Sequence, residues 1–474
     1  MDKKKPLVID LDGTLIKTDM LYETFISALK NNFIILFFVP YWLFRGKAYL
    51  KQQLACRSSI DVEVLPYELN FLTWIKGQKK LGRYLVLCTA SDQKIAEKIA
   101  DFLGCFDRVV GSSNGQNIRA DVKAQKIIEI LDTDNFDYAG NSIDDLKVWK
   151  RSRSAILVNP SKSVEKVAKR NFEVTKEFQS EKQTIKSISA MLRWHQWVKN
   201  ILIFTPIFAA GQVTISNISI AFLGLIAFSL CASAVYILND LIDLESDRHH
   251  KDKCNRPFAS GKLSILTGFI AAPLLLFLSG CLAINVGISF SFTLLFYFLF
   301  TTLYSLIFKS IVLLDCFSLA FLYTLRIFAG AVACEIPLTF WFLAFSVFIF
   351  LSLAFLKRHA ELLDAEKSNI DTIKGRGYLR SDLMIVQQIG IISGFIGVLI
   401  LCLYINSDSV KEVYSSPNAL WASVPILLFW VCWVWVASHR GKMHHDPIVF
   451  AVKDRVSCFL GLIFISSFFC AYIY

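Results

Sequence analysis

The chain has 474 residues, of which 54% are hydrophobic, and its formal net charge is +11. A mean hydropathy of +0.49 excludes a disordered chain and indicates a membrane protein. No basic stripe is interleaved with aromatic side chains that could stack on bases, so nucleic acid is not an expected partner.

The N-terminus and the cysteines indicate a reducing, cytoplasmic environment for the first part of the chain. The opening residues Met-Asp-Lys-Lys-Lys lead into a strand-like run and not into the apolar core of a signal peptide. The 12 cysteines are scattered singly, with no CxxC pair and no Cys/His spacing typical of zinc. We expect buried thiols, without zinc or disulfides.

Residues 1–178 have globular patterning and predict an α/β domain with a Rossmann-like, doubly wound parallel sheet. Short apolar strands are expected at 6–11, at 84–88 and from 137 onward, with helices between them. Residues 20–79 form a mostly helical insertion, which we expect to act as a cap.

Within this insertion, residues 33–44 are almost entirely apolar and are interrupted by Pro40. A bilayer span takes about 20 residues, so this run is too short to cross. Two interpretations stay open: a helix buried in the cap, or a hairpin that dips into the cytoplasmic leaflet of the membrane.

Two aspartates end the first expected strand, in the sequence Asp10-Leu-Asp12-Gly-Thr. Ligands of open α/β sheets lie at the carboxyl ends of the strands. Paired carboxylates there suit phosphoryl transfer, because one can attack phosphorus while the other moves a proton. Thr89, after a second strand, can hydrogen-bond a phosphoryl oxygen, and Lys123 can neutralise an aspartyl-phosphate.

A third polar segment, Gly140–Asp145, follows a later strand and can hold Mg²⁺. This order of motifs resembles the haloacid dehalogenase-like phosphatases over about residues 5–175. The resemblance implies that Asp10 is the nucleophile and Asp12 the general acid/base. The implied Mg²⁺ ligands are Asp10, Asp12, Asn141 and Asp145. The family usually has aspartate where this chain has Asn141, so an active phosphatase and a scaffold without activity both stay open.

Residues 179–198 form a basic linker, part of which is expected as an amphipathic helix on the membrane surface. Residues 199–474 are dominated by apolar runs long enough for spanning helices and predict an all-α polytopic membrane domain. Nine transmembrane helices are expected, at 198–212, 218–239, 265–286, 288–307, 311–333, 338–356, 384–405, 419–437 and 456–474.

Charged residues in the loops predict the topology. One side of the expected spans carries nearly all the basic residues, including Lys357, Lys374 and Arg440, whereas the other side carries only Lys411. The positive-inside bias places the basic side in the cytoplasm with the N-terminal domain, and the C-terminus outside. We therefore expect a multi-pass protein of the inner, cytoplasmic membrane.

The most distinctive motif is Asn239-Asp240-Leu-Ile-Asp243-Leu-Glu-Ser-Asp247, which directly follows an apolar run. On one helix the three aspartates share a face, where their mutual repulsion favours binding of a cation. Mg²⁺ suits oxygen ligands and commonly shares its shell with substrate phosphates. The alternative is an acidic, solvated loop after a span.

Several other polar residues are expected on the same cytoplasmic side. Arg326 lies about three helical turns after Asp315, and we expect this intramembrane arginine to pair with a carboxylate or a phosphate. The other expected substrate-binding residues are Lys199, Asn239, Arg256, Tyr304, Lys309, Lys357 and Arg358. For each basic residue the alternative is a topology signal at the membrane edge.

Over residues 190–474 the chain resembles the UbiA-type prenyltransferase superfamily, whose first aspartate-rich motif has the form NDxxDxxxD. Members that prenylate aromatic rings carry a second motif, DxxxD. Here Asp315 is followed by Leu319 at that spacing, so the second aspartate is missing. Further motifs resemble the narrower group of polyprenyl-phosphate 5-phosphoribosyltransferases, although Trp194 stands where proline is more usual. These motifs are RxxQWxKN at 193–200, YSxxxKxxxxxD at 304–315, LRxxAG at 325–330 and KRxxE at 357–361.

The resemblance implies transfer of 5-phosphoribose from phosphoribosyl pyrophosphate to a polyprenyl phosphate, which attacks the ribose carbon directly. Mg²⁺ would stabilise the leaving diphosphate. Its implied ligands are Asp240, Asp243, Asp247 and Asp315. The implied phosphate-binding residues are Lys199, Arg256, Lys309 and Arg326. If the N-terminal domain then removes the 5-phosphate, the product is polyprenyl-phosphoryl-ribose.

Two alternatives stay open. One is an aromatic prenyltransferase of quinone or related lipid biosynthesis, against which the missing aspartate at Leu319 argues. The other is a transporter or membrane scaffold without catalysis. The sequence indicates neither the length of the polyprenol nor an oligomeric state.

Overall fold

The computed structural model describes residues 5–113, 118–179, 185–367, 371, 376–443 and 447–473. The chain divides into two compact units. Unit 1 comprises Met1–Leu192 and Tyr236–Ala272, and unit 2 comprises Arg193–Val235 and Pro273–Tyr474. The acidic motif therefore belongs to the same unit as the N-terminal part. Lys374 and residues 180–184 of the expected linker lie outside the described residues.

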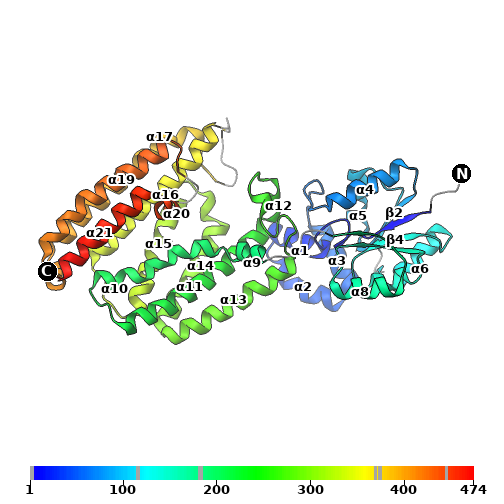
Figure 1. Ribbon diagram of the computed structural model, residues 1–474, viewed down its shortest axis with the longest axis horizontal. Coiled ribbons are helices and arrows are strands. Elements are labelled where there is room, and N and C mark those ends of the chain that lie inside the picture. Colours follow the sequence, from blue (N-terminus) through cyan, green and yellow to red (C-terminus); the bar gives the residue numbers. More distant parts are fainter. Residues whose placement is uncertain are drawn as a thin grey trace. The chain divides into compact units, whose positions relative to one another are not determined.

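Unit 1 is built on a six-stranded sheet with the strand order β3-β2-β1-β4-β5-β6 (Figure 1). The strands are β1 (Leu7–Ile9), β2 (Leu85–Asp92), β3 (Arg108–Ser112), β4 (Asp137–Gly140), β5 (Ser154–Val158) and β6 (Val174–Phe178). All of these pairings are parallel, and Val8 lies between Val86 and Tyr138 at the centre. The expected parallel sheet is confirmed.

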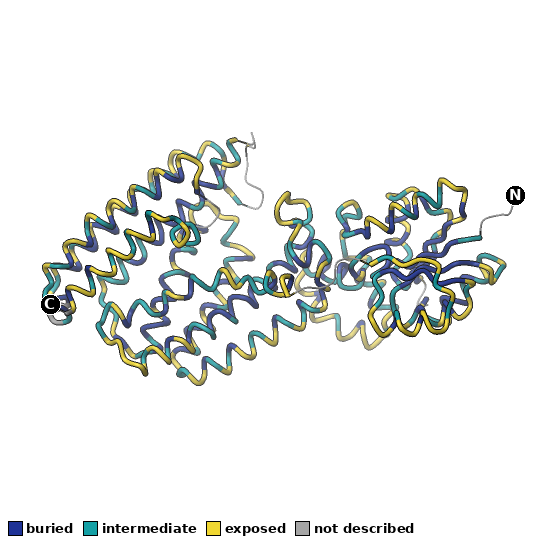
Figure 2. The backbone as a smooth tube through the Cα atoms, viewed as in Figure 1, coloured by how far each residue is buried: buried dark blue, intermediate teal, exposed yellow. Residues whose placement is uncertain are grey.

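Helices cover both faces of this sheet. The helices of the chain up to Leu192 are α1 (Met20–Asn31), α2 (Ile35–Phe44), α3 (Lys47–Arg57), α4 (Leu69–Lys80), α5 (Gln93–Leu103), α6 (Asp121–Leu131), α7 (Asp145–Trp149), α8 (Lys162–Asn171) and α9 (Ile185–Leu192). Leu7 and Ile9 share a core with α4 and α5, whereas Val8 shares one with α6, α7 and α8. Successive side chains of a strand point to opposite faces, so the central strands are buried on both sides (Figure 2).

Residues 20–79 contain the expected helices. Helix α2, however, does not fit the interpretation of residues 33–44 as a helix buried in the cap. Only Ile35 and Trp42 of α2 are buried. Its other phenylalanines and leucines are at least half exposed. The interpretation of this run as a buried cap helix is therefore wrong.

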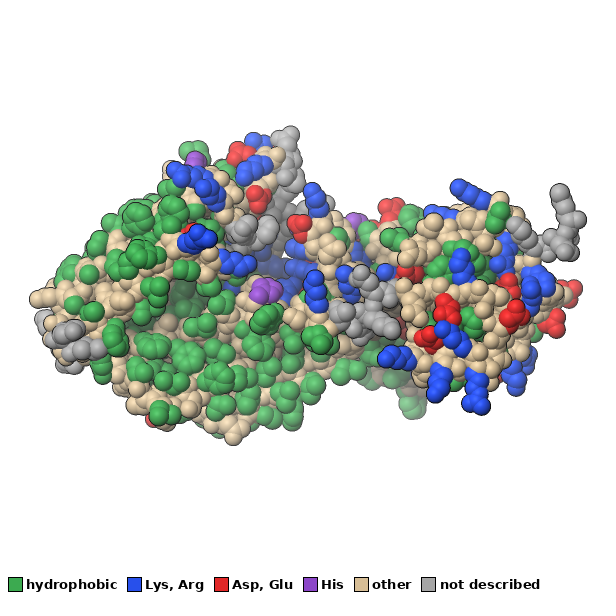
Figure 3. Space-filling model, in the orientation of Figure 1, with side chains coloured by type: hydrophobic (Ala, Val, Ile, Leu, Met, Phe, Trp, Pro, Cys, Tyr) green, Lys and Arg blue, Asp and Glu red, His purple; other side chains and the backbone are tan. Residues whose placement is uncertain are grey.

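Long apolar helices make up most of the remaining chain. The helices of eleven residues or more are η1 (Trp194–Phe204), α11 (Ile215–Ile242), α13 (Ile265–Val286), α14 (Ile288–Leu306), α15 (Leu314–Ala333), α16 (Phe340–Lys367), α17 (Leu383–Ile405), α19 (Ser423–His439) and α21 (Arg455–Ile473). Among the described residues, eight helices are long and apolar enough to cross a membrane, which makes this a multi-pass membrane protein. Hydrophobic side chains cover the visible surface of the helices of unit 2 (Figure 3).

Shorter helices connect these elements. They are α10 (Thr205–Ala209), α12 (Leu244–His249), η2 (Lys253–Asn255), η3 (Phe308–Ser310), η4 (Arg380–Asp382), α18 (Asp408–Val413), η5 (Pro417–Ala422) and α20 (Pro447–Lys453).

The first of the nine expected spans, at 198–212, is not confirmed as a long apolar α-helix. It consists of η1, a 3-10 helix, and the five-residue α10, with Pro206 in its first turn. Within unit 2 this segment runs antiparallel to α11. Near the start of this segment Trp197 donates a hydrogen bond to Ser233, and further along the segment Ile203 lies close to Gly224. A 3-10 helix rises about 2 Å per residue, so η1 and α10 together reach about 30 Å despite their few residues.

Helices α16 and α17 approach closely along a stripe of glycines. A Cβ atom at Gly390 would lie 2.8 Å from Cβ of Phe355, and one at Gly394 would lie 2.9 Å from Oγ of Ser352. Small residues let membrane helices pack with their backbones in near contact. The nearest atoms at these two positions belong to Trp435 and Val431 of α19, at 2.4 and 2.7 Å, so the glycines let α17 pack closely against both α16 and α19.

Candidate active sites

The aspartates of the N-terminal motif follow β1 in a tight loop. Gly13 in this loop has φ +73°, and a Cβ atom there would lie 2.1 Å from Nδ2 of Asn141. Glycine alone combines this backbone conformation with so close a neighbour. The loop after β1 and the loop after β4 are thus brought into contact, as the sequence predicts for these two motifs.

Asp10 is buried and lies 2.7 Å from Nζ of Lys123. Lys123 also donates to the hydroxyl of Tyr138, which in turn donates to Asp145 at 2.7 Å. Burial raises the pKa of Asp10 to about 7, although Lys123 acts against this rise. Burial alone would lower the pKa of Lys123, but Asp10 and Asp145 hold it above its usual value. Lys123 therefore lies beside Asp10, and the roles of nucleophile and phosphate ligand stay predictions.

Asp12 is held from two directions. Its Oδ1 accepts from the backbone N–H of Met20, at the start of α1, at 2.8 Å. Its Oδ2 accepts from the hydroxyl of Ser91 at 2.6 Å and from that of Thr89 at 3.3 Å. Thr89 thus lies beside the aspartates, where a phosphoryl oxygen is expected, and the carboxylate of Asp12 has a fixed orientation.

Asp145 shapes the loop after β4. Its buried Oδ2 accepts from the backbone N–H groups of Asn141 and Ser142 and from the hydroxyl of Ser142. The site then combines the carboxylates of Asp10 and Asp12 with the amide oxygen of Asn141. Mg²⁺ prefers such oxygen ligands, so these residues fit the ion that the sequence predicts. The ligand role of Asp145 stays a prediction.

The acidic motif does not lie on one uninterrupted helix. Helix α11 ends at Ile242 and α12 begins at Leu244, with Asp243 between them. The turn still continues, because the N–H of Asp243 donates to the carbonyl of Asn239 and the N–H of Asp247 donates to that of Asp243. The expectation of a single helix is wrong at this break.

Arg256 joins two aspartates of the motif. Its Nη1 lies 3.0 Å from Asp240 and 2.6 Å from Asp247, and both carboxylates are buried. Burial raises the pKa of Asp247, and Arg256 opposes this rise. The structure therefore brings Asp240, Asp247 and the predicted phosphate ligand Arg256 together. Two carboxylates that share one positive group also suit a divalent cation.

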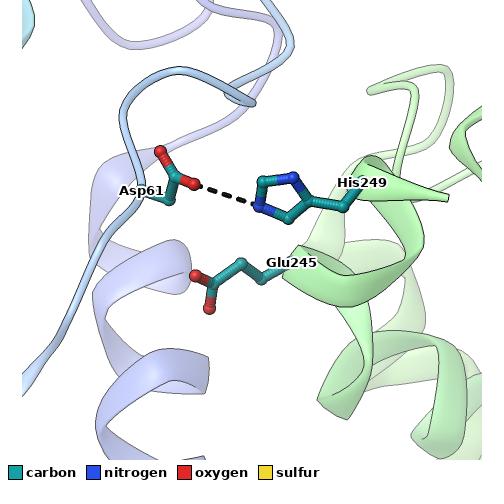
Figure 4. Close-up of side chains that lie close together, drawn as sticks. All are labelled: Asp61, Glu245 and His249. Carbon is teal, nitrogen blue, oxygen red and sulfur yellow. Dashed lines mark hydrogen bonds and ion pairs between the residues drawn. The ribbon is translucent and has the colours of Figure 1, made fainter. Parts of the chain in front are cut away.

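Polar side-chain contacts hold helix α12 against the N-terminal part of unit 1. Arg248 donates through two nitrogens to Glu23 of α1, and both side chains are almost fully buried. His249 lies 3.0 Å from Asp61, with Glu245 alongside (Figure 4). The potential ligand atoms of Asp61, Glu245 and His249 all lie within 4.8 Å of one another. The acidic motif and the N-terminal aspartates are therefore parts of one connected unit.

In unit 2, Asp315 is the centre of a buried ionic cluster. Its carboxylate pairs with Arg358 and accepts from the hydroxyl of Tyr378 at 2.7 Å. Arg376 lies 3.5 Å from the same carboxylate and donates to the hydroxyl of Tyr304. The predicted residues Asp315, Tyr304 and Arg358 thus come together. Asp315 is engaged by arginines, and its role as a metal ligand stays a prediction.

Arg326 is buried in unit 2, but its partners differ from the expected carboxylate or phosphate. It donates to Oδ1 of Asn200 at 2.8 Å and to the hydroxyl of Tyr297 at 2.9 Å, and also to the carbonyl of Leu322. The side-chain amide of Asn200 in turn donates a hydrogen bond to the hydroxyl of Ser229, which fixes its orientation. The expected carboxylate partner is therefore not found among these contacts, because all three acceptors are neutral, and the expected phosphate partner stays a prediction.

The remaining predicted ligands occupy defined positions. Lys199 is buried in η1, with Nζ 5.9 Å from the ring centroid of Tyr323. Asn239 lies near the end of α11, Lys309 in η3, and Lys357 in α16 beside Arg358. Their substrate contacts stay predictions.

Several residues of these sites were missed by sequence reasoning. They are Ser91, Tyr138, Asn200 and Arg376. A buried tyrosine in a strand looks like an ordinary core residue, so Tyr138 gave no signal. Asn200 belongs to the quoted RxxQWxKN motif, which could have identified it.

A family model for the UbiA prenyltransferase family matches residues 201–443. The chain belongs to the UbiA prenyltransferase family. A protein of Sinorhizobium fredii named "Uncharacterized protein y4nM" is 36% identical over 472 residues, covering 98% of this chain and 91% of that protein. The match over nearly the full length means that this family member shares its N-terminal part with a relative.

Two further similarities concern the separate parts of this UbiA family member. A decaprenyl-phosphate phosphoribosyltransferase of Mycolicibacterium smegmatis is 27% identical over 301 residues, covering 60% of this chain and 92% of that protein. A solved structure titled "Phospho-Aspartyl Intermediate Analogue of Phosphoserine phosphatase" aligns with 38% of this chain and 95% of its own, at 14% identity and a TM-score of 0.27.

Proposed function

We propose that the membrane part transfers 5-phosphoribose from phosphoribosyl pyrophosphate to a polyprenyl phosphate. The observation that carries this proposal is the convergence of Asp240 and Asp247 on one positive group, Arg256. A diphosphate leaving group is stabilised by a divalent cation, and buried paired carboxylates suit Mg²⁺. The printed name of the mycobacterial relative supports a phosphoribosyl group and a polyprenyl phosphate as reactants.

The reaction breaks the bond between ribose C1 and the diphosphate oxygen and forms a bond from C1 to an oxygen of the lipid phosphate. The attacking oxygen already carries negative charge, so the step needs no strong general base. Bound Mg²⁺ would neutralise the departing diphosphate. Asp240, Asp243 and Asp247 would hold that cation, and the guanidinium of Arg256 would then be available to the diphosphate oxygens.

The cluster around Asp315 supports an acceptor that is itself anionic. Arg358 and Arg376 bring two guanidinium groups to this cluster, and the carboxylates of Asp315 and Glu361 balance their charge. Arg358 also pairs with Glu361, which fixes the orientation of its guanidinium. A phosphate monoester suits such a site better than a neutral aromatic ring. Asp315 positions these arginines.

The N-terminal part then removes the 5-phosphate. Asp10 attacks phosphorus through Oδ, and Asp12 gives a proton to the departing ribose O5. Water, deprotonated by Asp12, hydrolyses the aspartyl-phosphate to free phosphate and regenerates Asp10. Lys123, 2.7 Å from Asp10, balances the negative charge that collects there. The products are polyprenyl-phosphoryl-ribose and inorganic phosphate.

Mass spectrometry of the lipid products tests both steps. Membranes with the wild-type chain or Asp10→Asn are supplied with labelled phosphoribosyl pyrophosphate and a polyprenyl phosphate. We expect the dephosphorylated lipid from the wild type and the 5-phosphorylated lipid from the variant. Identical products would remove the N-terminal part from the scheme. Label transfer only from a prenyl diphosphate to an aromatic acid would replace it with the ring-prenylating alternative.

The topology follows from the same proposal. The catalytic groups and the N-terminal part lie in the cytoplasm, where phosphoribosyl pyrophosphate is made. The short segment of η1 and α10 crosses the inner membrane as the first of nine spans, which places the C-terminus outside. Support comes from the backbone carbonyl of Gly211, at the end of this segment, which accepts from the hydroxyl of Tyr472 beside the C-terminus. Reporter fusions after residue 212 and at the C-terminus test this arrangement, because both must report the outer side.

A further inference from the structure

Helix α2 presents an apolar surface that the described residues leave largely uncovered. Phe37 is 82% exposed and Phe44 is 92% exposed. Leu36, Phe38 and Leu43 are each exposed by 50% or slightly more. Apolar surface in water costs roughly 25 cal/mol per Å², and soluble surfaces rarely carry contiguous patches of this kind without a partner.

A few buried contacts with α3 determine which side of α2 faces outward. Ile35 and Trp42 pack into a small core with Leu50 and Leu54 of α3. The ring of Trp42 also lies 4.9 Å from the guanidinium of Arg57. These contacts hold the helix in one orientation, so the exposed phenylalanines cannot turn inward without breaking them.

The charge around α2 suits an anionic surface. Residues 24–60 contain no aspartate or glutamate. They carry five basic residues, Lys30, Arg45, Lys47, Lys51 and Arg57. Lys30 and Arg45, on either side of the apolar run, and Lys47 just beyond it are all exposed. A basic residue near anionic lipid headgroups contributes about 1 kcal/mol of binding.

Helix α1, which precedes α2 in the cap, contacts the start of a candidate membrane span. Phe25 and Tyr22 of α1 lie 5.6 Å and 6.1 Å, between ring centroids, from Phe269. Phe269 is in the second turn of α13, which is long and apolar enough to cross a membrane. The cap therefore lies beside the end of α13 at which this candidate span begins.

We propose that α2 docks on the bilayer, inserting its exposed apolar face into the leaflet at which α13 begins, while Lys30, Arg45 and Lys47 contact anionic phospholipid headgroups. The ten residues of α2 extend about 15 Å, half of a hydrocarbon core of about 30 Å, so the helix enters one leaflet without crossing. A second protein chain could also cover an apolar face, but the cationic flanks and the adjoining span favour lipid. If the proposed phosphatase step is correct, this contact also keeps Asp10 close to a lipid-borne substrate.

Photo-crosslinking to lipid tests this docking on the full chain. The protein is reconstituted in nanodiscs that contain a phospholipid with a diazirine on its acyl chain, and tryptic peptides are analysed. Trypsin cuts after Lys30 and Arg45, so residues 31–45 form one peptide. We expect at least fivefold more lipid adducts on this peptide than on peptide 127–147. That peptide carries Ile143, which is 69% exposed in the same unit.

A matched pair of variants completes the test. Phe37→Asp should reduce lipid labelling of peptide 31–45 at least threefold, whereas Val167→Asp, at another exposed apolar position, should leave it unchanged. Thermal unfolding of both variants checks that the fold is intact, and neither position belongs to the proposed active sites. Equal labelling of the two peptides overturns the proposal. Labelling of residues 31–45 by a water-soluble carbene and not by lipid also overturns it, as does protection from both reagents, which indicates a protein cover.

Discussion

Glu23 and Arg248 lie 225 positions apart in the sequence and form a two-pronged ion pair, with N–O distances of 2.6 and 3.1 Å. Their side chains are only 4% and 6% exposed. The pair joins α1, which begins at the amide that holds Asp12, to α12, which ends the acidic motif. The ion pair thus connects the two helices that lie beside the two proposed active sites.

Breaking this pair should destabilise unit 1. Glu23→Gln leaves the buried charge of Arg248 without its counter-charge, and we expect a loss of about 3 kcal/mol in the free energy of unfolding. The double variant Glu23→Gln/Arg248→Met should recover most of this loss, because both charges are then removed. Thermal or denaturant unfolding followed by hydrogen exchange on α1 and α12 measures the change.

An exposed pair provides the control. Lys169 lies on the surface of α8, 2.8 Å from both Glu165 and Glu177, and Lys169→Met should leave the unfolding midpoint almost unchanged. If Glu23→Gln were equally mild, the buried pair would not hold α1 and α12 together.

The carboxylates that meet at Arg256 should be essential for transfer. Asp240→Asn or Asp247→Asn removes one of the three carboxylates proposed to hold the cation, and we expect transfer to fall by about 100-fold or more. Glu245→Gln on α12 is a neighbouring acidic residue outside this pair and should keep activity within about twofold. Initial rates over a range of Mg²⁺ concentrations separate weakened metal binding from slower chemistry. Equal losses in all three variants would point to a nonspecific effect of charge.

Asn141 should limit Mg²⁺ binding at the N-terminal site. Asn141→Asp adds a charged oxygen in place of a neutral one, and we expect the Mg²⁺ concentration for half-maximal phosphatase activity to fall by about tenfold. Asn141→Ala should raise it. If all three proteins respond alike to Mg²⁺, this amide does not contact the ion.

Mg²⁺ binding at this site should weaken in acid. Burial raises the pKa of Asp10 to about 7, so the metal-free carboxyl is largely neutral below pH 7 and must lose its proton to bind the ion. The apparent dissociation constant should rise by about tenfold for each pH unit below 7 and level off above it. Calorimetric titration between pH 6 and 8 measures this slope. Asp10→Asn cannot titrate and should have lost most of the dependence.

Neutralising Arg326 should weaken binding of an anionic substrate. Asn200→Asp is nearly isosteric and places a carboxylate 2.8 Å from the guanidinium, in place of an amide oxygen. We expect KM for one of the two substrates to rise by about tenfold with little change in kcat, as for an interaction made equally in the ground and transition states. An unchanged KM for both substrates would show that this charge does not contact a phosphate.

The sequence predicted the parts of this protein whose signals are local. Alternating and continuous apolar runs located β1, β2 and β4, and short motifs located Asp10, Asp240 and Asp315. The pairing of Glu23 with Arg248 had no such signal, because neither residue is unusual among its own neighbours. Contacts over such distances arise only when the chain has folded.

Hydrophobicity alone also left the surroundings of apolar segments undetermined. Residues 33–44 are as apolar as a buried helix, but burial depends on what the neighbouring helices cover. The run at 198–212 is too short for an α-helical span, and its 3-10 geometry depends on packing along α11. Both outcomes were set by tertiary contacts.

The glycine stripe of α17 has a consequence for the path of the proposed isoprenoid acceptor. Side chains of α16 lie against the backbone of α17 at Gly390 and Gly394, which leaves no room for a methyl-branched tail between these two helices. If the acceptor is a polyprenyl phosphate, its hydrocarbon chain therefore has to enter between other helices.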